Sequence, residues 1–184
     1  MNETAIKTLF LDIGGVLLTN GWGHLSRTKA AKEFHLDNNE FERRHRQTFD
    51  TYESGKMTLS SYLKFTVFYE SRSFSEKDFI QFIKGESVAL SGAIDFFKSL
   101  KKKYQLKVIA VSNEGREINA FRVSTFKLNE LFDAYVSSSF VHLRKPDMDI
   151  FRLALDIAQT APEHCIYIDD RLMFVEIAKS LGMN

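Results

Sequence analysis

A chain of 184 residues is long enough to form one or two domains with a sizeable hydrophobic core. Its 44% hydrophobic and 27% charged residues are typical of a soluble globular protein. The net charge of +1 gives no indication of a nucleic acid or an anionic membrane as a partner, and no apolar run is long enough to span a bilayer.

The cysteine content and the first residues bear on cellular location. Cys165 is the single cysteine, which excludes an internal disulfide and a cysteine-rich zinc site and fits a reducing compartment. It falls within a predicted strand, so we expect it in the core. Residues 1–4 contain no basic flank followed by an apolar run, so we expect no secretory signal. Together these features predict a cytoplasmic protein.

The first predicted element is a short buried strand over residues 8–11, which leads into Asp12, Gly14 and Gly15. Glycine permits a sharp turn and lets backbone N–H groups come close to a ligand. A carboxylate at the C-terminal end of a central parallel strand lies where α/β sheets bind their ligands. On this stretch alone, the simpler interpretation of Asp12 as a turn residue is favoured, because short motifs often match by chance.

A loop over residues 19–23 contains Trp22, and His24 follows it. For Trp22, packing against other apolar groups is favoured over a role as a lid on the site. For His24, a position at a helix start or on the surface is favoured over a role as a catalytic acid.

A long helical region follows this loop. We predict four helices there: one over residues 26–34, one from the N-cap Asn39 to residue 52, one capped by Thr58, and one that starts at Ser75. Acidic and basic residues are interleaved at 40–46, which indicates a solvated helix face rather than a nucleic-acid-binding patch. A helical insert after a first strand predicts a cap domain over residues 21–87, on a core domain of residues 1–20 and 88–184.

From residue 91, helices and strands alternate along the chain. The predicted helices cover residues 91–103, 116–126, 149–159 and 172–181, and the predicted strands cover residues 106–111, 134–137 and 165–168. Such alternation implies right-handed crossovers between parallel strands. The predicted fold class is therefore α/β, a Rossmann-like, doubly wound parallel sheet with a helical-bundle cap.

Three of the predicted strands end in polar residues, which a parallel sheet brings to one edge. The residues at these strand ends are Asp12, then Ser112 and Asn113, then Asp169 and Asp170. Lys145, in Arg144-Lys145-Pro146-Asp147, opens a predicted helix that faces the same edge. Taken one at a time, these residues have ordinary explanations as helix caps or surface groups. Their joint occurrence in this order predicts a site.

The residue types at this edge indicate magnesium and phosphoryl chemistry. Crowded carboxylates repel one another unless a cation joins them, and Mg²⁺ prefers oxygen ligands. We expect the ion between Asp12, the Gly14 carbonyl and Asp170, with Asp169 nearby. Lys145 would help to neutralise a phosphoryl group, and an aspartyl-phosphate would form on Asp12. Its oxygens would be bound by Ser112 and by the N–H groups that follow it.

The motifs resemble those of the haloacid dehalogenase-like hydrolases over nearly the whole chain. The matching segments are Asp12-Ile13-Gly14-Gly15-Val16-Leu17, Val111-Ser112-Asn113, Arg144-Lys145-Pro146-Asp147 and Ile168-Asp169-Asp170. The resemblance implies a Mg²⁺-dependent phosphatase of a small phosphorylated metabolite, with Asp12 and Lys145 as catalytic residues. It also implies substrate binding by Gly15, Ser112, Asn113 and Lys145, and metal binding by Asp12, Gly14, Asp169 and Asp170. Residues 53–58 are similar to a segment of the sugar-phosphate phosphatase branch.

One position departs from the family pattern. Most phosphatases of this family carry an aspartate where this chain has Gly14, and that aspartate acts as general acid and base. Such help is typically worth about 10²–10⁴-fold in rate. Three outcomes are open: a substrate with a good leaving group, such as an anomeric sugar phosphate; a proton from another group or from water; or a chain with weak or no activity. A branch of the family with glycine here includes sugar-1-phosphate phosphatases, which keeps phosphatase the leading prediction.

Two other functions remain open at this point. A haloacid dehalogenase would use the same Asp12 nucleophile, and its halide leaving group needs no proton, so Gly14 permits it. The acidic pair Asp169-Asp170 favours a metal-dependent phosphatase, because dehalogenation needs no metal. A non-catalytic binding protein that keeps the fold and the metal site is the second alternative. Arg116 either faces the pocket or lies on a helix surface, and the sequence predicts no oligomeric state.

Overall fold

The structure is a computed structural model, and it describes residues 5–184. The prediction of no secretory signal rests on residues 1–4, which lie outside the described residues. The elements in chain order are β1 (Thr8–Leu11), α1 (His24–Glu33), α2 (Asn38–Glu53), α3 (Leu59–Thr66), α4 (Glu76–Gly85), α5 (Ala93–Tyr104), β2 (Lys107–Ser112), α6 (Arg116–Thr125), η1 (Leu128–Glu130), β3 (Ala134–Ser137), α7 (Ser138–Val141), α8 (Met148–Ala158), η2 (Pro162–His164), β4 (Cys165–Ile168) and α9 (Leu172–Ser180).

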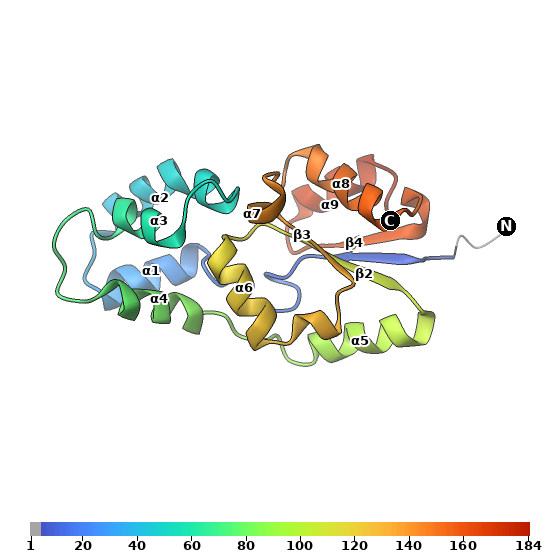
Figure 1. Ribbon diagram of the computed structural model, residues 1–184, viewed down its shortest axis with the longest axis horizontal. Coiled ribbons are helices and arrows are strands. Elements are labelled where there is room, and N and C mark those ends of the chain that lie inside the picture. Colours follow the sequence, from blue (N-terminus) through green and yellow to red (C-terminus); the bar gives the residue numbers. More distant parts are fainter. Residues whose placement is uncertain (1–4) are drawn as a thin grey trace.

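Within residues 5–184, four parallel strands form one sheet in the order β3-β2-β1-β4 (Figure 1). In this sheet Leu11 of β1 lies opposite Ala110 of β2 and Ile168 of β4. The chain winds outward from β1 through β2 to β3 and then returns to β4 on the other side of β1. The winding therefore reverses at the ends of β1 and β4, where sheets of this kind bind their ligands. The predicted doubly wound parallel sheet is confirmed.

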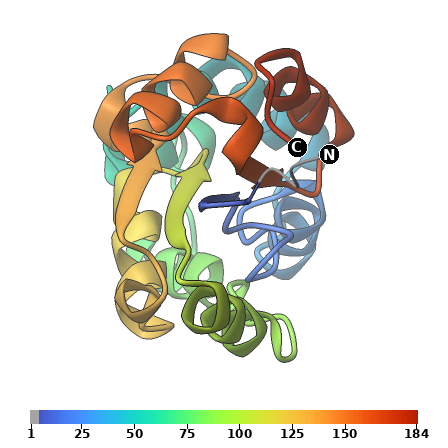
Figure 2. The ribbon, with the colours of Figure 1, turned by 90° about the vertical axis from the view of Figure 1, so that its right-hand side faces the viewer.

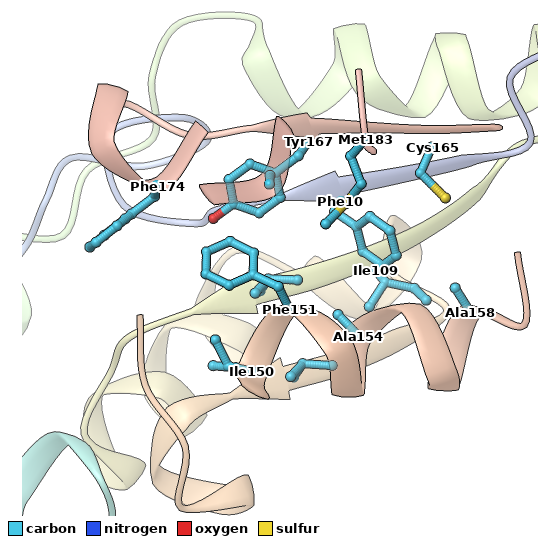
Figure 3. Packing of buried hydrophobic residues seen from close by; sticks show 13 residues of the cluster. Phe10, Ile109, Ile150, Phe151, Ala154, Ala158, Cys165, Tyr167, Phe174 and Met183 are labelled. Atoms are coloured by element: carbon cyan, nitrogen blue, oxygen red, sulfur yellow. The ribbon is translucent and has the colours of Figure 1, made fainter. Parts of the chain in front are cut away.

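Helices cover both faces of the sheet, with α8 and α9 on one face and α5 and α6 on the other (Figures 1 and 2). Strand β1 is buried throughout, as its unbroken apolar sequence predicts. Successive side chains of a strand point to opposite faces, so Phe10 joins the α8 side while Leu9 and Leu11 join the α5 side. Figure 3 shows Phe10 in the cluster on the α8 side, in which the rings of Phe151 of α8 and Tyr167 of β4 lie 5.3 Å apart between centroids. This packing holds the end of β1 rigidly in the centre of the molecule.

Helices α1 to α4 form a further hydrophobic cluster, built largely from aromatic side chains and joined by Ile118 of α6. Phe41 of α2, Tyr62 of α3 and Phe79 of α4 are each no more than 1% exposed. In Figure 1 these helices lie at the end of the sheet toward which β1 runs, so they stand over the C-terminal ends of the strands. No helix within residues 5–184 is both long and apolar enough to cross a bilayer.

The helix caps were predicted in part. Thr58 and Ser75 cap α3 and α4 as expected, each accepting a backbone N–H bond in the first turn. The cap of α2 is Asp37 rather than Asn39, because the Asp37 carboxylate accepts N–H bonds from two residues at the positive end of the helix.

Candidate active site

The carboxylates predicted for the site meet at the C-terminal edge of the sheet. Asp12 follows β1 and Asp169 follows β4, and the parallel register places them side by side. The backbone N–H of Asp12 donates to the Ile168 carbonyl at 2.9 Å, which continues the pairing by one residue. Carboxylate oxygens of Asp12, Asp169 and Asp170 lie within 4.8 Å of one another. These oxygens could hold a metal ion.

Lys145 lies between two of these carboxylates. Its Nζ is 3.1 Å from Asp12 Oδ2 and 2.6 Å from Asp169 Oδ2, and the residue is 1% exposed. The sequence predicted that Lys145 opens a helix. In the structure it lies in the loop before α8, which begins at Met148. One ammonium group facing three carboxylates leaves an excess of negative charge, which suits a further cation.

Asn113 positions Lys145 from the end of β2. The Asn113 side-chain amide donates to the Lys145 carbonyl at 2.8 Å, and the Lys145 N–H donates back to Asn113 Oδ1 at 2.8 Å. Both polar atoms of the Asn113 side chain therefore form hydrogen bonds with Lys145. The backbone N–H of Asn113 is the group that remains to bind a substrate. Ser112, which ends β2, is 1% exposed and lines the same cavity as Asp12.

The acidic pair after β4 is held by its neighbours. Asp169 accepts hydrogen bonds from the Tyr167 hydroxyl at 2.6 Å and from the Arg171 N–H at 2.9 Å. Asp170 lies against Gly15, where a Cβ atom would come within 2.3 Å of the Asp170 Cγ at a backbone φ of +73°. A glycine is thus required at position 15 for the close approach of the two loops. Its N–H donates to the Leu18 carbonyl at 2.7 Å, so a substrate-binding role for Gly15 stays a prediction.

Burial dominates the ionisation of Asp12. Desolvation raises the pKa of its carboxyl, the positive charge of Lys145 lowers it, and the negative charge of Asp169 raises it again. The net direction is upward. A nucleophilic carboxylate must be ionised, so a second cation near Asp12 would favour the reactive form.

A cavity of about 430 Å³ opens above this edge. Its sheet side includes Asp12, Gly14, Ser112, Asn113 and Lys145, and its helical side includes Trp22, His24, His45, Phe49 and Tyr52. The ring of Trp22 packs on Phe41 and Phe79, so the expected packing role is confirmed, and Trp22 also lines the cavity. His24 begins α1 as expected and also lines the cavity.

Arg116 takes the second of its two expected positions. It is exposed, donates to the Ser139 carbonyl at 2.9 Å and lies over the Phe140 ring, 4.1 Å from its centroid. It is absent from the cavity lining formed by residues 5–184. Cys165 is buried in β4, as predicted.

Two polar side chains beside the site were not identified from the sequence. Asn20 donates to Asp170 Oδ2 at 2.9 Å from the loop after β1. Arg122 of α6 forms a buried ion pair with Glu114 and lines the cavity. The sequence did contain one indication of the role of Arg122. It lies four residues after the apolar Ile118 on α6, which places a charge on the buried face of an amphipathic helix.

Contacts around residues 53–58 join the helices to the core. Arg144, next to Lys145, forms ion pairs with Asp50 and Glu53 of α2. Gly55 lies so close to Ser139 that a Cβ atom would come within 2.0 Å of the Ser139 carbonyl oxygen, at a φ of +71°. The segment that resembled a sugar-phosphate phosphatase sequence is therefore a docking contact in this fold.

Comparison with known sequences identifies the family of this chain and two related proteins. A family model described as haloacid dehalogenase-like hydrolase matches residues 6–182. A phosphorylated carbohydrates phosphatase of Thermotoga maritima is 31% identical over 98 residues, which cover 53% of this chain and 44% of that protein. A drimenol cyclase of Aspergillus calidoustus is 28% identical over 185 residues, which cover 97% of this chain and 33% of that protein. The chain thus spans less than half the length of each relative.

Solved structures share the fold. A HAD family enzyme from Bacteroides thetaiotaomicron, an Asp-to-Ala mutant in complex with magnesium and inorganic phosphate, superposes with a TM-score of 0.82 at 22% identity over 98% of this chain and 92% of that chain. The L-2-haloacid dehalogenase from Xanthobacter autotrophicus with covalently bound chloropropionic acid gives 0.66 at 16% identity over 97% and 75%. At these identities the structures establish the fold alone.

Proposed function

The chain belongs to the haloacid dehalogenase-like hydrolases, and on that premise we propose that it is a Mg²⁺-dependent phosphatase of a small phosphorylated metabolite. The observation that carries the proposal is the cluster of three carboxylates beside a buried lysine at the switch point of the sheet. The phosphatase relative supports a phosphorylated carbohydrate as the substrate class. The single buried cysteine supports a cytoplasmic location.

In the proposed reaction Asp12 is the nucleophile. One of its carboxylate oxygens bonds to phosphorus while the bond from phosphorus to the leaving-group oxygen breaks, and the electron pair stays on that oxygen. Lys145, Ser112 and the Asn113 N–H bind the phosphoryl oxygens and balance their charge. A water oxygen then attacks the same phosphorus, which releases inorganic phosphate, restores the Asp12 carboxylate and gives one proton to solvent.

The donor set fits magnesium, because hard carboxylate and carbonyl oxygens are the ligands that this ion prefers. Asp12, Asp170 and the Gly14 carbonyl would hold the ion, with Asp169 nearby. When bound, Mg²⁺ supplies charge neutralisation for the phosphoryl group.

We assign residues 21–87 to a cap domain and residues 1–20 and 88–184 to the core domain. The hydrophobic cluster of α1 to α4 supports this division, because Ile118 is its one buried member outside residues 21–87 among the described residues. So do the two connecting segments, which pair with each other where the Thr19 N–H donates to the Val88 carbonyl at 2.8 Å. The cap would select the leaving group, because its wall combines aromatic rings with the polar groups of His45 and Tyr52. Such a surface suits a hydroxylated ring, such as that of a sugar phosphate.

Hydrolysis of 4-nitrophenyl phosphate tests the proposal. We expect turnover that requires Mg²⁺, stops when a chelator is added and returns with excess Mg²⁺. Asp12→Asn keeps the shape of the side chain but removes the nucleophile, so its rate should fall at least about 10³-fold. Trapping of a fluoroberyllate adduct on Asp12 would separate an enzyme from a binding protein. Metal binding with neither turnover nor an adduct would refute the phosphatase proposal.

Gly14 keeps a dehalogenase as the second candidate function. A halide leaves without a proton, so the missing carboxyl group at position 14 would cost that reaction nothing. A 2-haloacid incubated with the protein in the presence of a chelator tests this alternative. Halide release that survives chelation would favour the dehalogenase over the phosphatase.

A further inference from the structure

The space beside Gly14 is occupied by two side chains from elsewhere in the molecule. A Cβ atom built on Gly14 would lie 3.0 Å from Asn20 Oδ1 and 3.8 Å from Arg122 Nη1. Asn20 comes from the loop after β1, and Arg122 comes from α6. An amide and a guanidinium therefore stand where an acidic side chain at position 14 would extend.

The guanidinium of Arg122 is held in this place on several sides. The residue is 2% exposed. Its Nε donates to Ser87 Oγ at 3.1 Å, its Nη1 pairs with Glu114, and its Nη2 donates to the Thr19 carbonyl. A Cβ atom at Gly21 would come within 2.8 Å of Nη2, so the glycine leaves room for the group. Arg122 is thus oriented before any ligand arrives.

Arg122 retains donors for a ligand. A guanidinium carries five N–H groups, and the three contacts with Ser87, Glu114 and Thr19 engage one each. Two N–H groups remain, and Arg122 lines the same cavity as Asp12. Burial lowers the pKa of Arg122 to about 10, and the charge of Asp12 opposes this shift, so the group is positively charged at neutral pH.

We propose that Arg122 is a catalytic residue that binds the leaving-group oxygen and stabilises its negative charge, in place of the general acid that Gly14 lacks. This inference rests on the proposed phosphatase function. As the phosphorus–oxygen bond breaks, the electron pair moves onto the leaving-group oxygen, and an Arg122 N–H donates a hydrogen bond to it. The guanidinium keeps its proton, because its pKa is too high for proton transfer. A basic leaving group takes its proton from water afterwards.

This chemistry defines a substrate class. A fixed cation stabilises an anion but does not protonate it, so leaving groups that are stable as anions are preferred. Acyl phosphates, phosphoanhydrides and anomeric sugar phosphates belong to this class, and simple alkyl phosphates do not. The preference would follow from the leaving group's acidity more than from its shape.

The competing explanation is a structural role. Arg122 contacts both segments that connect core and helices, Thr19 on one and Ser87 on the other. If it only held these segments together, its removal would slow every substrate by the same factor. Dependence on the leaving group therefore separates the two roles.

The experiment compares kcat/KM with Mg²⁺ for aryl phosphates of graded phenol acidity, acetyl phosphate and one alkyl phosphate. Wild type, Arg122→Met, Arg122→Lys and Ser87→Ala are assayed, and circular dichroism checks that each is folded. We expect Arg122→Met to lose about 10²-fold on the most basic leaving groups and less than about 10-fold on the most acidic. Arg122→Lys, which keeps a cation and is the safer variant for folding, should lie between. Ser87→Ala, which removes one hydrogen-bond acceptor of Arg122, should show the same dependence of kcat/KM on leaving-group acidity as wild type.

Equal losses on all leaving groups in both Arg122 variants, or no loss in either, would overturn the inference while leaving the phosphatase proposal intact. A wild-type protein that hydrolyses none of these compounds with Mg²⁺ would instead overturn the phosphatase proposal, and the inference with it. The result that would support the inference is a plot of log kcat/KM against the pKa of the leaving group that is steeper for Arg122→Met than for wild type. For Arg122→Lys the slope should lie between the two.

Discussion

The two walls of the cavity differ in how their polar groups are held. On the sheet side, Asp169 is bonded to Tyr167, Lys145 and Arg171, and Asn113 uses both side-chain polar atoms. On the helical side, the hydroxyl of Tyr52 is buried without a hydrogen-bond partner among residues 5–184.

The difference has an energetic meaning. A buried polar group without a partner costs about 1–3 kcal/mol. On the sheet side the buried Nε of Arg144 also lacks a partner among residues 5–184, but Asp169, Lys145 and Asn113 carry no such cost. These reactive groups are therefore held in place before a substrate binds, which is the condition for electrostatic catalysis. The helical side carries the cost at Tyr52, and a small change in its position would relieve it. The comparison suggests that the sheet side determines the reaction and the helical side adapts to the leaving group.

The largest effect should come from removing the buried cation on the sheet side. Lys145→Met leaves Asp12 and Asp169 facing each other without their common partner, so we expect phosphatase activity to fall about 10³-fold. The free energy of unfolding should fall by about 3–5 kcal/mol, as measured by urea denaturation. The control is Lys98→Met, which removes a surface pair with Glu130 and should change stability by less than about 1 kcal/mol. Similar results for the two variants would contradict a rigid, charge-paired sheet side.

The docking of the helices on the core is tested by two glycines that share one backbone conformation. Gly55 and Gly92 both have a φ of +71°. A Cβ atom on Gly55 would collide with the Ser139 carbonyl, whereas no atom of residues 5–184 lies within 4 Å of a Cβ atom on Gly92. Gly92→Ala should cost about 1–2 kcal/mol from backbone strain alone. Gly55→Ala should cost a further 1–3 kcal/mol, roughly the range for overpacking, and should raise KM. If urea denaturation gave equal losses of unfolding free energy for the two variants, the backbone at Ser139 would be able to move aside for the added methyl group at little cost.

Metal binding should depend on the sheet side alone. Asp170→Asn removes one proposed ligand charge, so we expect the Mg²⁺ concentration for half-maximal activity to rise about 10-fold or more. Thermal stabilisation by Mg²⁺ should shrink in parallel. Asp149→Asn is the matched control, because that carboxylate is exposed and its one ion pair within residues 5–184 is with Arg152 in α8. An unchanged Mg²⁺ requirement in Asp170→Asn would remove Asp170 from the proposed metal site.

The smallest predicted effect is a pH dependence from the helical side. Burial, assisted by the charge of Arg27, lowers the pKa of His45 to about 3. The unfolded chain protonates this histidine near pH 6.5 and the folded chain does not, so the folded state loses stability as the pH falls below about 6.5. We expect a loss of at most about 2 kcal/mol between pH 7 and pH 5, which His45→Gln should abolish. The control is His35→Gln, which changes an exposed histidine. If His45→Gln kept the same dependence of unfolding free energy on pH, other groups would cause that dependence.

The fold and the edge where polar groups gather could be predicted from the amino-acid sequence alone. Strands β3 and β4 were predicted with their observed bounds, because short apolar runs between turn residues are a local signal. Parallel strands align their C-terminal ends, so Asp12 and Asp169 could be placed together without knowledge of their contacts. Such inferences need only local pattern and one rule of sheet geometry.

The side chains beside Gly14 and the unpaired polar groups of the helical side, in contrast, could be identified only in the folded chain. Arg122 is a charge on the buried face of α6, and the position of its partner Glu114 beside it emerges only in the folded chain. The unpaired hydroxyl of Tyr52 likewise depends on how α2 lies against α6. Contacts between helices arise from side-chain shapes that are complementary in three dimensions, and no periodicity in the chain encodes them.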